Sequence, residues 1–255
     1  MRRLTISVLL MLLAALPARA EEVVAALSQT RVALTATFEG SEILVFGAVR
    51  RETPMLPEDV PLEVIVTISG PTEPVTVWRK ARVAGVWMNV DGVRINEAPS
   101  FYAVATTAPL TQALSSTEDL RHRVSIDRAI RTYGAYAATA DAPAFTAALR
   151  RLRERDDLYQ MLEGEVEMER DTLFSTRISL PANLTEGVYT TRIFLTREGA
   201  VVDRFDTAIN VQKVGIERWL FQLAQQQPLA YGALAVLIAV LAGWGASAAF
   251  RYFRS

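Results

Sequence analysis

The chain has 255 residues, of which 51% are apolar, with 27 basic side chains, 28 acidic ones and no cysteine. The net charge of −1 argues against a nucleic-acid partner, because phosphate binding needs a basic excess. The absence of cysteine excludes disulfides, thiol nucleophiles and thiolate metal sites, and a single histidine, His122, excludes multi-histidine metal sites. A length of this order is typical of one or two domains.

Residues 1–20 have the pattern of a secretory signal peptide. Two arginines precede an apolar run from Leu4 to Leu16 that is too short to span a bilayer, and Ala18-Arg19-Ala20 supplies a small–x–small cleavage pattern before Glu21. We expect Sec-type export and cleavage after residue 20. An uncleaved N-terminal anchor is the alternative.

The first part of the remaining chain predicts short β-strands separated by Gly and Pro turns. Apolar and polar residues alternate from Arg31 to Phe38 and again through Leu62, Val64, Val66 and Ile68. Two further strands are expected at Val75–Trp78 and Val83–Val90, with Asp91-Gly92 as a turn. Aromatic residues in strands usually belong to the core, so we expect Trp78 and Trp87 to be buried.

The middle of the chain, about residues 110–163, predicts helices. A helix start at Asp141-Ala142-Pro143 and a stop at Gly164 bracket apolar residues at helical spacing, which predicts a helix over 143–163. A shorter helix is expected near Ser116-Thr117-Glu118-Asp119, which resembles a capping box.

Strands return after the helices, and they decide the fold class. Tyr189 to Leu195 and Phe205 to Val211 alternate on either side of a Glu198-Gly199 turn, which predicts a hairpin. This second β block is too small to stand alone, so it should pair with the first. We therefore predict a mainly β fold with an α insertion: an immunoglobulin-like antiparallel β-sandwich over 21–213 with helices inserted at about 110–163.

The C-terminal part predicts one transmembrane helix. No charge occurs from Trp219 to Phe250, and residues 228–250 are long enough to cross the hydrocarbon core as a helix. A juxtamembrane helix is expected over 214–227, interrupted by Pro228. Arg251 and Arg254 make the tail 251–255 cytoplasmic by the positive-inside rule, so the main domain lies outside the cytoplasm and the topology is single-pass type I. Residues 21–227 carry a net charge of −6, which favours solubility and disfavours docking on an anionic membrane.

Several short motifs resemble one known family. They are turn glycines and packing aromatics that include Phe38-Glu39-Gly40, Trp87-Met88-Asn89, Pro99-Ser100-Phe101-Tyr102-Ala103, Leu180-Pro181-Ala182 and Gly243-Trp244. Over nearly its whole length the chain resembles the alphaproteobacterial family "Putative transmembrane protein", which has no assigned function. The resemblance implies a periplasmic domain on an inner-membrane anchor, and a sulfite-exporter-like membrane protein as a partner.

Few residues predict chemistry, and no catalytic motif is present, so we expect no enzyme, no cofactor and no metal site. His122 is expected to be a structural histidine. Arg150 and Arg151, with Arg121, Arg123, Arg128 and Arg131 near them in sequence, are candidates for binding a small oxyanion, although a charged, solvated helix face is the alternative. Four glutamates at alternate positions, Glu163 to Glu169, are expected on one solvated strand face, with Ca²⁺ as the alternative.

The predicted anchor carries a line of small residues. Ala235, Ala239, Gly243 and Ser247 recur at every fourth position, which allows another helix to approach closely in lipid; composition bias is the alternative. We therefore expect a non-enzymatic accessory or assembly subunit of a polytopic membrane protein such as a transporter, or self-association. A periplasmic small-oxyanion binding or sensing module is the alternative function.

Overall fold

The structure is a computed structural model that describes residues 21–34, 40–51, 60–133, 141–213 and 223–253. The predicted signal peptide and most of the predicted juxtamembrane helix lie outside the described residues. Strand β1 begins at Glu21, the residue that follows the predicted cleavage site.

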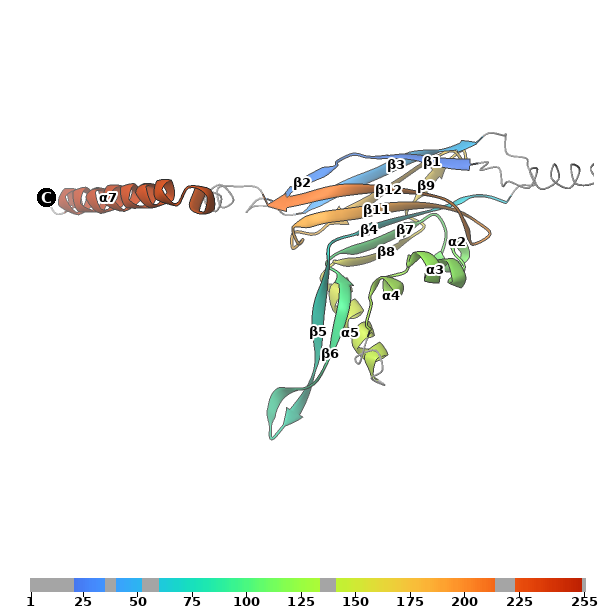
Figure 1. Cartoon of the computed structure of the whole chain (residues 1–255), viewed down its shortest axis with the longest axis horizontal. Coiled ribbons are helices and arrows are strands. Elements are labelled where there is room, and N and C mark those ends of the chain that lie inside the picture. The colour runs from blue at the N-terminus through green and yellow to red at the C-terminus, as the bar shows by residue number, and fades with distance from the viewer. Residues whose placement is uncertain (1–20, 35–39, 52–59, 134–140, 214–222, 254–255) are drawn as a thin grey trace, which may run out of the picture.

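Two β-sheets form the body of the molecule (Figure 1). One sheet has four antiparallel strands, in the order β1 (Glu21–Leu27), β3 (Ser41–Arg51), β10 (Leu173–Leu180) and β9 (Glu167–Glu169). The other has six, in the order β2 (Arg31–Leu34), β12 (Ala200–Lys213), β11 (Gly187–Arg197), β4 (Glu63–Ser69), β7 (Tyr102–Thr106) and β8 (Tyr159–Glu163).

The two sheets share one apolar core. In β10 alternate residues such as Phe174 and Ile178 are buried, because only one face of the four-stranded sheet meets the other sheet. Ile43 of β3 and Ile193 of β11 belong to the same buried cluster. The predicted mainly β fold, with the two β blocks paired through β11–β4 and β10–β3, is confirmed.

Two edge pairings differ from the antiparallel expectation. Strand β2 pairs with β12 in parallel, and β8 pairs with β7 in parallel. Parallel neighbours need a long crossover, and the helical insertion provides it for β7 and β8.

Helices cover the outer face of the six-stranded sheet at its centre, where β4 and β7 are buried on both faces. They are α2 (Leu110–Ala113), α3 (Ser116–His122), α4 (Ile126–Ala129) and α5 (Ala142–Arg155). Ser115 caps α3 by accepting a hydrogen bond from the Glu118 backbone N–H, so the predicted start of this helix is confirmed.

The predicted helix over 143–163 ends earlier, at Arg155. Asp157 takes a positive φ of 57°, which turns the chain, and Tyr159–Glu163 then joins the sheet as β8. Tyr159 and Leu162 match the helical spacing of the apolar residues before them. They nevertheless lie in a strand, where pairing with β7 determines their burial.

The register of the central strands places several chain ends together. Ser69 at the end of β4 lies opposite Thr190, and Gly187 at the start of β11 lies opposite Val211 near the end of β12. We call this end of the sandwich the α7 end, because β12 leads from it toward α7 (Pro228–Phe253). The Glu198-Gly199 turn lies at the far end.

Helix α7 is apolar on all sides. Its 18-residue stretch Pro228–Gly245 has a mean hydropathy of 1.8, and none of it is buried in the protein. Length and composition make it a candidate membrane span. Pro228 stands at its first position, where a proline costs no backbone hydrogen bond.

Tyr102 ties the helical layer to the sheet. Its hydroxyl donates to the Val124 carbonyl at 2.8 Å and accepts from Nη2 of Arg192 at 3.0 Å. Tyr102→Phe removes one hydrogen bond from the Val124 carbonyl and one from the Arg192 guanidinium. We therefore expect the free energy of unfolding to fall by about 1–3 kcal/mol. Urea unfolding of the full chain in mild detergent measures it, and an unchanged midpoint would contradict this role.

Alkaline pH is expected to destabilise the fold. Burial raises the pKa of Tyr102 to about 12 and also raises the pKa of Tyr159. Unfolded tyrosine ionises near pH 10, so the stability that depends on the neutral hydroxyls is present below pH 10 and is lost as the pH rises toward about 12. Unfolding free energies measured from pH 9 to 12 should fall, and the fall should be shallower in Tyr102→Phe.

Candidate functional site

A long two-stranded hairpin projects from the sandwich (Figure 1). It consists of β5 (Thr72–Val83) and β6 (Val86–Pro99), which pair only with each other among the described strands. Strand β4 ends at Ser69 and β5 begins at Thr72, so the hairpin leaves the sandwich at the α7 end. This is the element in which the sequence predictions fail most.

The turn of the hairpin is at Ala84-Gly85 and not at the predicted Asp91-Gly92. Ala84 and Gly85 both have positive φ, 49° and 87°, which is the geometry of a tight hairpin turn that matches strand twist. Gly92 lies inside β6 opposite Trp78, where a Cβ atom would stand 2.7 Å from the indole ring. Position 92 is therefore a glycine because the indole ring of Trp78 occupies the space that a side chain would need. In the sequence alone, an Asp-Gly pair resembles a turn.

Helix α5 braces the half of the hairpin nearest the body. The Arg79 guanidinium lies over the Phe145 ring, 4.8 Å from its centroid, and its Nη1 donates to Asp141 at 2.9 Å. Val77 and Ile95 are buried in this half. Phe145, Val77 and Ile95 belong to the same apolar cluster as the sandwich core, which fixes the direction of the hairpin.

The outer half, residues 80–90, has no such cover from the part of the chain that the structure describes, and we call it the hairpin tip. Its side chains are exposed: Val83 46%, Val86 63%, Trp87 68%, Met88 51% and Val90 49%. The expectation that Trp78 and Trp87 belong to the core is therefore wrong, since Trp78 is also 55% exposed. A two-stranded ribbon has no second layer to cover it, and large exposed apolar patches usually mark an interaction site.

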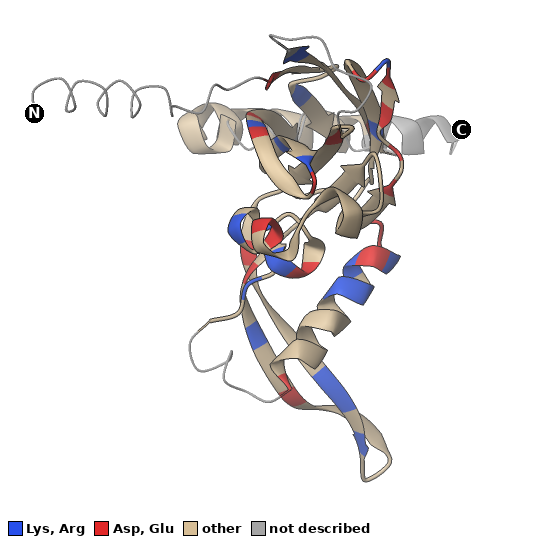
Figure 2. Ribbon diagram, turned by 90° about the vertical axis from the view of Figure 1, so that its right-hand side faces the viewer, with Lys and Arg blue, Asp and Glu red and all other residues tan. Residues whose placement is uncertain are grey.

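Basic residues accompany this apolar surface. The tip contains Lys80 and Arg82 and no acidic residue. Figure 2 shows basic segments along the lower hairpin and on α5. Arg82 donates from Nε to the Gly85 carbonyl at 3.1 Å, which holds its guanidinium at the turn.

The predicted oxyanion residues Arg150 and Arg151 do not form a shared site. The Arg150 guanidinium is bound by Glu154 at 2.7 Å and Asp127 at 2.9 Å, and these hydrogen bonds raise its pKa. Arg151 is exposed on α5. The oxyanion interpretation of these two residues stays a prediction, but Arg150 already has carboxylate partners.

Other arginines do converge. A hollow of about 460 Å³ lies beside the root of the hairpin, and among the described residues five arginines and one carboxylate, Glu97, line it. The arginines are Arg121, Arg123, Arg131, Arg192 and Arg204. Arg192 and Arg204 were missed by sequence reasoning, because they come from β11 and β12, far from the helices in sequence. The register of the six-stranded sheet places Arg192 and Arg204 at the hollow.

Most of these guanidinium groups have partners in the fold. Arg192 donates to the His122 carbonyl at 2.6 Å and to the Arg123 carbonyl at 3.1 Å, which caps the C-terminal end of α3. Arg204 donates from Nε to Asp206 at 2.7 Å, and this hydrogen bond raises its pKa. Arg123 is exposed and has no such partner among the described residues.

His122 packs as a structural histidine. Its ring meets the Phe194 ring edge-on, 5.5 Å between centroids, and its Nε2 lies 3.3 Å from Glu118.

The glutamates Glu163 to Glu169 do not share one strand, since Gly164 turns the chain between β8 and β9. No cluster of three or more metal-ligating side chains occurs in the described part of the chain.

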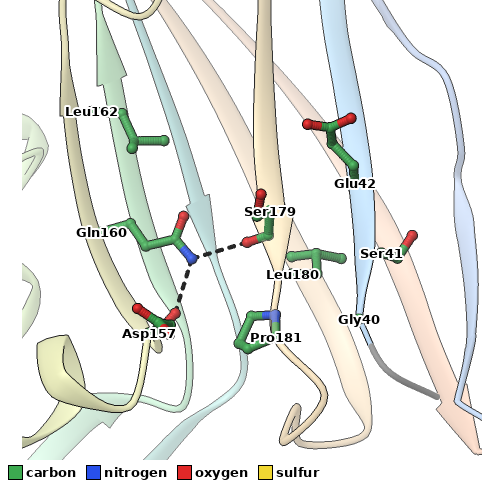
Figure 3. Close-up of a pocket in the computed structure, with 9 residues that line it drawn as sticks. All are labelled: Gly40, Ser41, Glu42, Asp157, Gln160, Leu162, Ser179, Leu180 and Pro181. Carbon is green, nitrogen blue, oxygen red and sulfur yellow. Dashed lines mark hydrogen bonds between the residues drawn. The ribbon is translucent and has the colours of Figure 1, made fainter. Parts of the chain in front are cut away.

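A second hollow, of about 660 Å³, opens between the two sheets (Figure 3). Gln160 of β8 crosses it, donating from Nε2 to the carbonyls of Asp157 and Ser179, each at 2.9 Å. The hydrogen bond to Ser179 joins the β8 edge of one sheet to β10 of the other, so it closes the sandwich at this edge.

The residues of the predicted helix-pairing line lie on α7. Ala235, Ala239 and Gly243 belong to the described helix, and a Cβ atom at Gly243 would meet nothing within 4 Å, so this face is open to another helix. Ser247 lies on the same helix. Pairing through this line stays a prediction.

Comparison with known proteins decides the family. The model of the family "Putative transmembrane protein" matches residues 22–252. The chain belongs to this family.

No curated protein matches the chain. Among solved structures, the chain is similar to the sporulation control protein Spo0M from Bacillus subtilis at 9% identity and a TM-score of 0.30, over 81% of this chain and 55% of that one. This chain spans about half the length of that protein, and so low a score transfers neither topology nor function.

The contact between Gly92 and Trp78 yields a testable prediction. Gly92→Val forces a Cβ against the indole ring, and overpacking of this kind costs about 1–3 kcal/mol. We expect faster trypsin cleavage at Arg79, Lys80 and Arg82, measured by mass spectrometry of timed digests. Asn89→Val, an exposed position in the same strand, should leave the rate unchanged; equal rates in both variants would contradict the packing role of Gly92.

Proposed function

We propose that this protein is a single-span inner-membrane subunit that acts by contact and not by catalysis. Helix α7 anchors it, the sandwich lies in the periplasm, and it serves as an accessory or assembly subunit of a polytopic membrane protein. A sulfite-exporter-like transporter is the partner that the family resemblance suggests.

The observation that carries this proposal is the shared end of the sandwich. Strand β5 begins at the α7 end and β12 ends there, so the hairpin that carries the exposed apolar tip is rooted on the side from which the chain continues to the anchor. This arrangement favours a protein that works beside the bilayer.

The chemistry of the titratable groups agrees with a contact role. Among the described residues, the side chains whose pKa shifts are three buried tyrosines and two arginines paired with carboxylates, and each shift follows from packing or pairing within the fold. Catalytic sites more often bring perturbed acids and bases together in one cleft.

The anchor provides the proposed partner face. Gly243→Leu fills the open line along Ala235 and Ala239, so we expect the partner to be lost when the tagged full-length protein is purified from its own membranes in mild detergent. Mass spectrometry identifies the partner. Gly245→Leu is the matched control, since it makes the same change on the opposite side of the helix. Recovery of the same partner with both variants would exclude pairing through this face.

A second candidate function, binding of a small oxyanion, is favoured by the five-arginine hollow at the root of the hairpin. Its exposed member Arg123 is the side chain that an anion would recruit.

Calorimetry with sulfite, sulfate and phosphate on the full-length protein tests that candidate. We expect saturable, salt-sensitive binding that Arg123→Gln weakens and Arg128→Gln, an exposed arginine outside the hollow, does not. Flat titrations with all three anions would remove the candidate.

A further inference from the structure

The hairpin tip has two different faces. Directly opposed residues of an antiparallel pair point to the same side. Val83 lies opposite Val86 and Ala81 opposite Met88, so one face is apolar. Arg82 lies opposite Trp87 and Lys80 opposite Asn89, so the other face combines two cations with an indole ring.

This combination is typical of segments that lie at a membrane interface. Tryptophan is enriched at the headgroup level, aliphatic side chains reach the start of the acyl region, and lysine and arginine keep their charges among anionic headgroups. The tip provides all three kinds of side chain within residues 80–90 and has no acidic residue to oppose them. We propose that the hairpin tip rests in the headgroup layer of the bilayer that holds α7, where it binds anionic lipid.

The root of the hairpin lies at the α7 end of the sandwich, which brings the membrane surface within reach of the tip. The hairpin begins at the α7 end of the sandwich, and the segment between β12 and α7 is 14 residues long, 214–227. The inference therefore rests on the proposed anchorage and adds a second contact to it. Since α7 already holds the chain at the membrane, even a weak contact is populated, because it forms within one molecule.

The backbone limits how far the tip enters. In a two-stranded ribbon the outward N–H and C=O groups of each strand have no partner, and such groups cannot be left unpaired in hydrocarbon. The tip therefore stops in the hydrated interface, and the braced half with Arg79 and Asp91 stays outside.

The net charge of the domain disfavours docking of the domain as a whole on an anionic membrane, but it opposes this local contact only weakly. Residues 21–227 carry −6 in total, but charges further away than a Debye length of about 10 Å are largely screened. What the membrane meets is the local charge of the tip, and that is positive.

Depth-dependent quenching tests the proposal. The chain has no cysteine, so Val86→Cys and Thr117→Cys each give one labelling site, at the tip and on α3. Backbone N–H of Ser115 bonds the Gly199 carbonyl, so Thr117 belongs to the far end and serves as the control. The full-length protein is placed at less than one copy per vesicle in phosphatidylcholine with and without phosphatidylglycerol, with nitroxide lipids that quench near the headgroups or deep in the acyl region.

We expect the label at residue 86 to be quenched by the shallow nitroxide more than by the deep one, and more in vesicles with phosphatidylglycerol. The label at residue 117 should be quenched by neither. The double substitution Lys80→Gln and Arg82→Gln should lower the equilibrium constant for membrane contact by the tip about thirtyfold, because each charge contributes a factor of about five. Arg128→Gln with Arg177→Gln removes the same charge from exposed positions elsewhere and should have no effect.

Equal quenching at residues 86 and 117 would overturn the proposal. Quenching at residue 86 that appears only when several copies share a vesicle would assign the tip to a second copy of the chain and would also overturn it. The vesicles contain no partner protein, so these results are independent of the co-purification test of the proposed function.

Discussion

Strand β11 lies antiparallel beside β4 at the centre of the six-stranded sheet, and this pairing joins two β blocks that the helical insertion separates in sequence. The pairs run from Thr190–Ser69 to Thr196–Glu63, with β4 buried on both faces. In β11 buried Tyr189 and Thr191 alternate with exposed Val188 and Thr190, so a slip by one residue would expose the buried side chains and bury the exposed ones. The same register brings the root of the hairpin and the exit toward α7 to one end of the domain.

The hairpin shows where the stabilising layers of the fold stop. Its inner half is covered by α5 and continues the core, whereas no described helix or sheet forms a second layer over its tip. An isolated two-stranded ribbon is marginal in water, so an exposed apolar tip is costly unless something covers it. We propose that the bilayer surface covers it, so that α7 and the tip together hold the sandwich in one orientation.

Local sequence patterns predict those parts of the structure in which burial follows a simple period. The alternation in β11 and β12, the Ser115 cap region of α3 and the uniform apolarity of α7 are visible in the chain without knowledge of its neighbours. The errors occur where tertiary context decides. Trp78 and Trp87 look like core residues because a strand in isolation does not reveal whether a second layer exists. Tyr159–Glu163 reads as the end of a helix because its pairing partner, β7, lies far away in sequence.

The candidate sites divide in the same way. The small residues of α7 and the basic residues of the tip are local features, and the sequence displays both. The arginine hollow requires Arg192 and Arg204 from strands that only the sheet register brings beside α3, so no local pattern predicts it. The hollow between the sheets likewise depends on contacts between β8 and β10.

Both membrane contacts require that the α7 end of the sandwich faces the bilayer. Energy transfer from a donor on the protein to acceptor-labelled lipid headgroups measures this directly in vesicles that contain the full-length chain. Asn183, an exposed residue shortly before β11, marks the α7 end, and Thr117 marks the far end. We expect clearly higher transfer efficiency from a donor at residue 183 than from one at residue 117. Equal or reversed efficiencies would contradict this orientation.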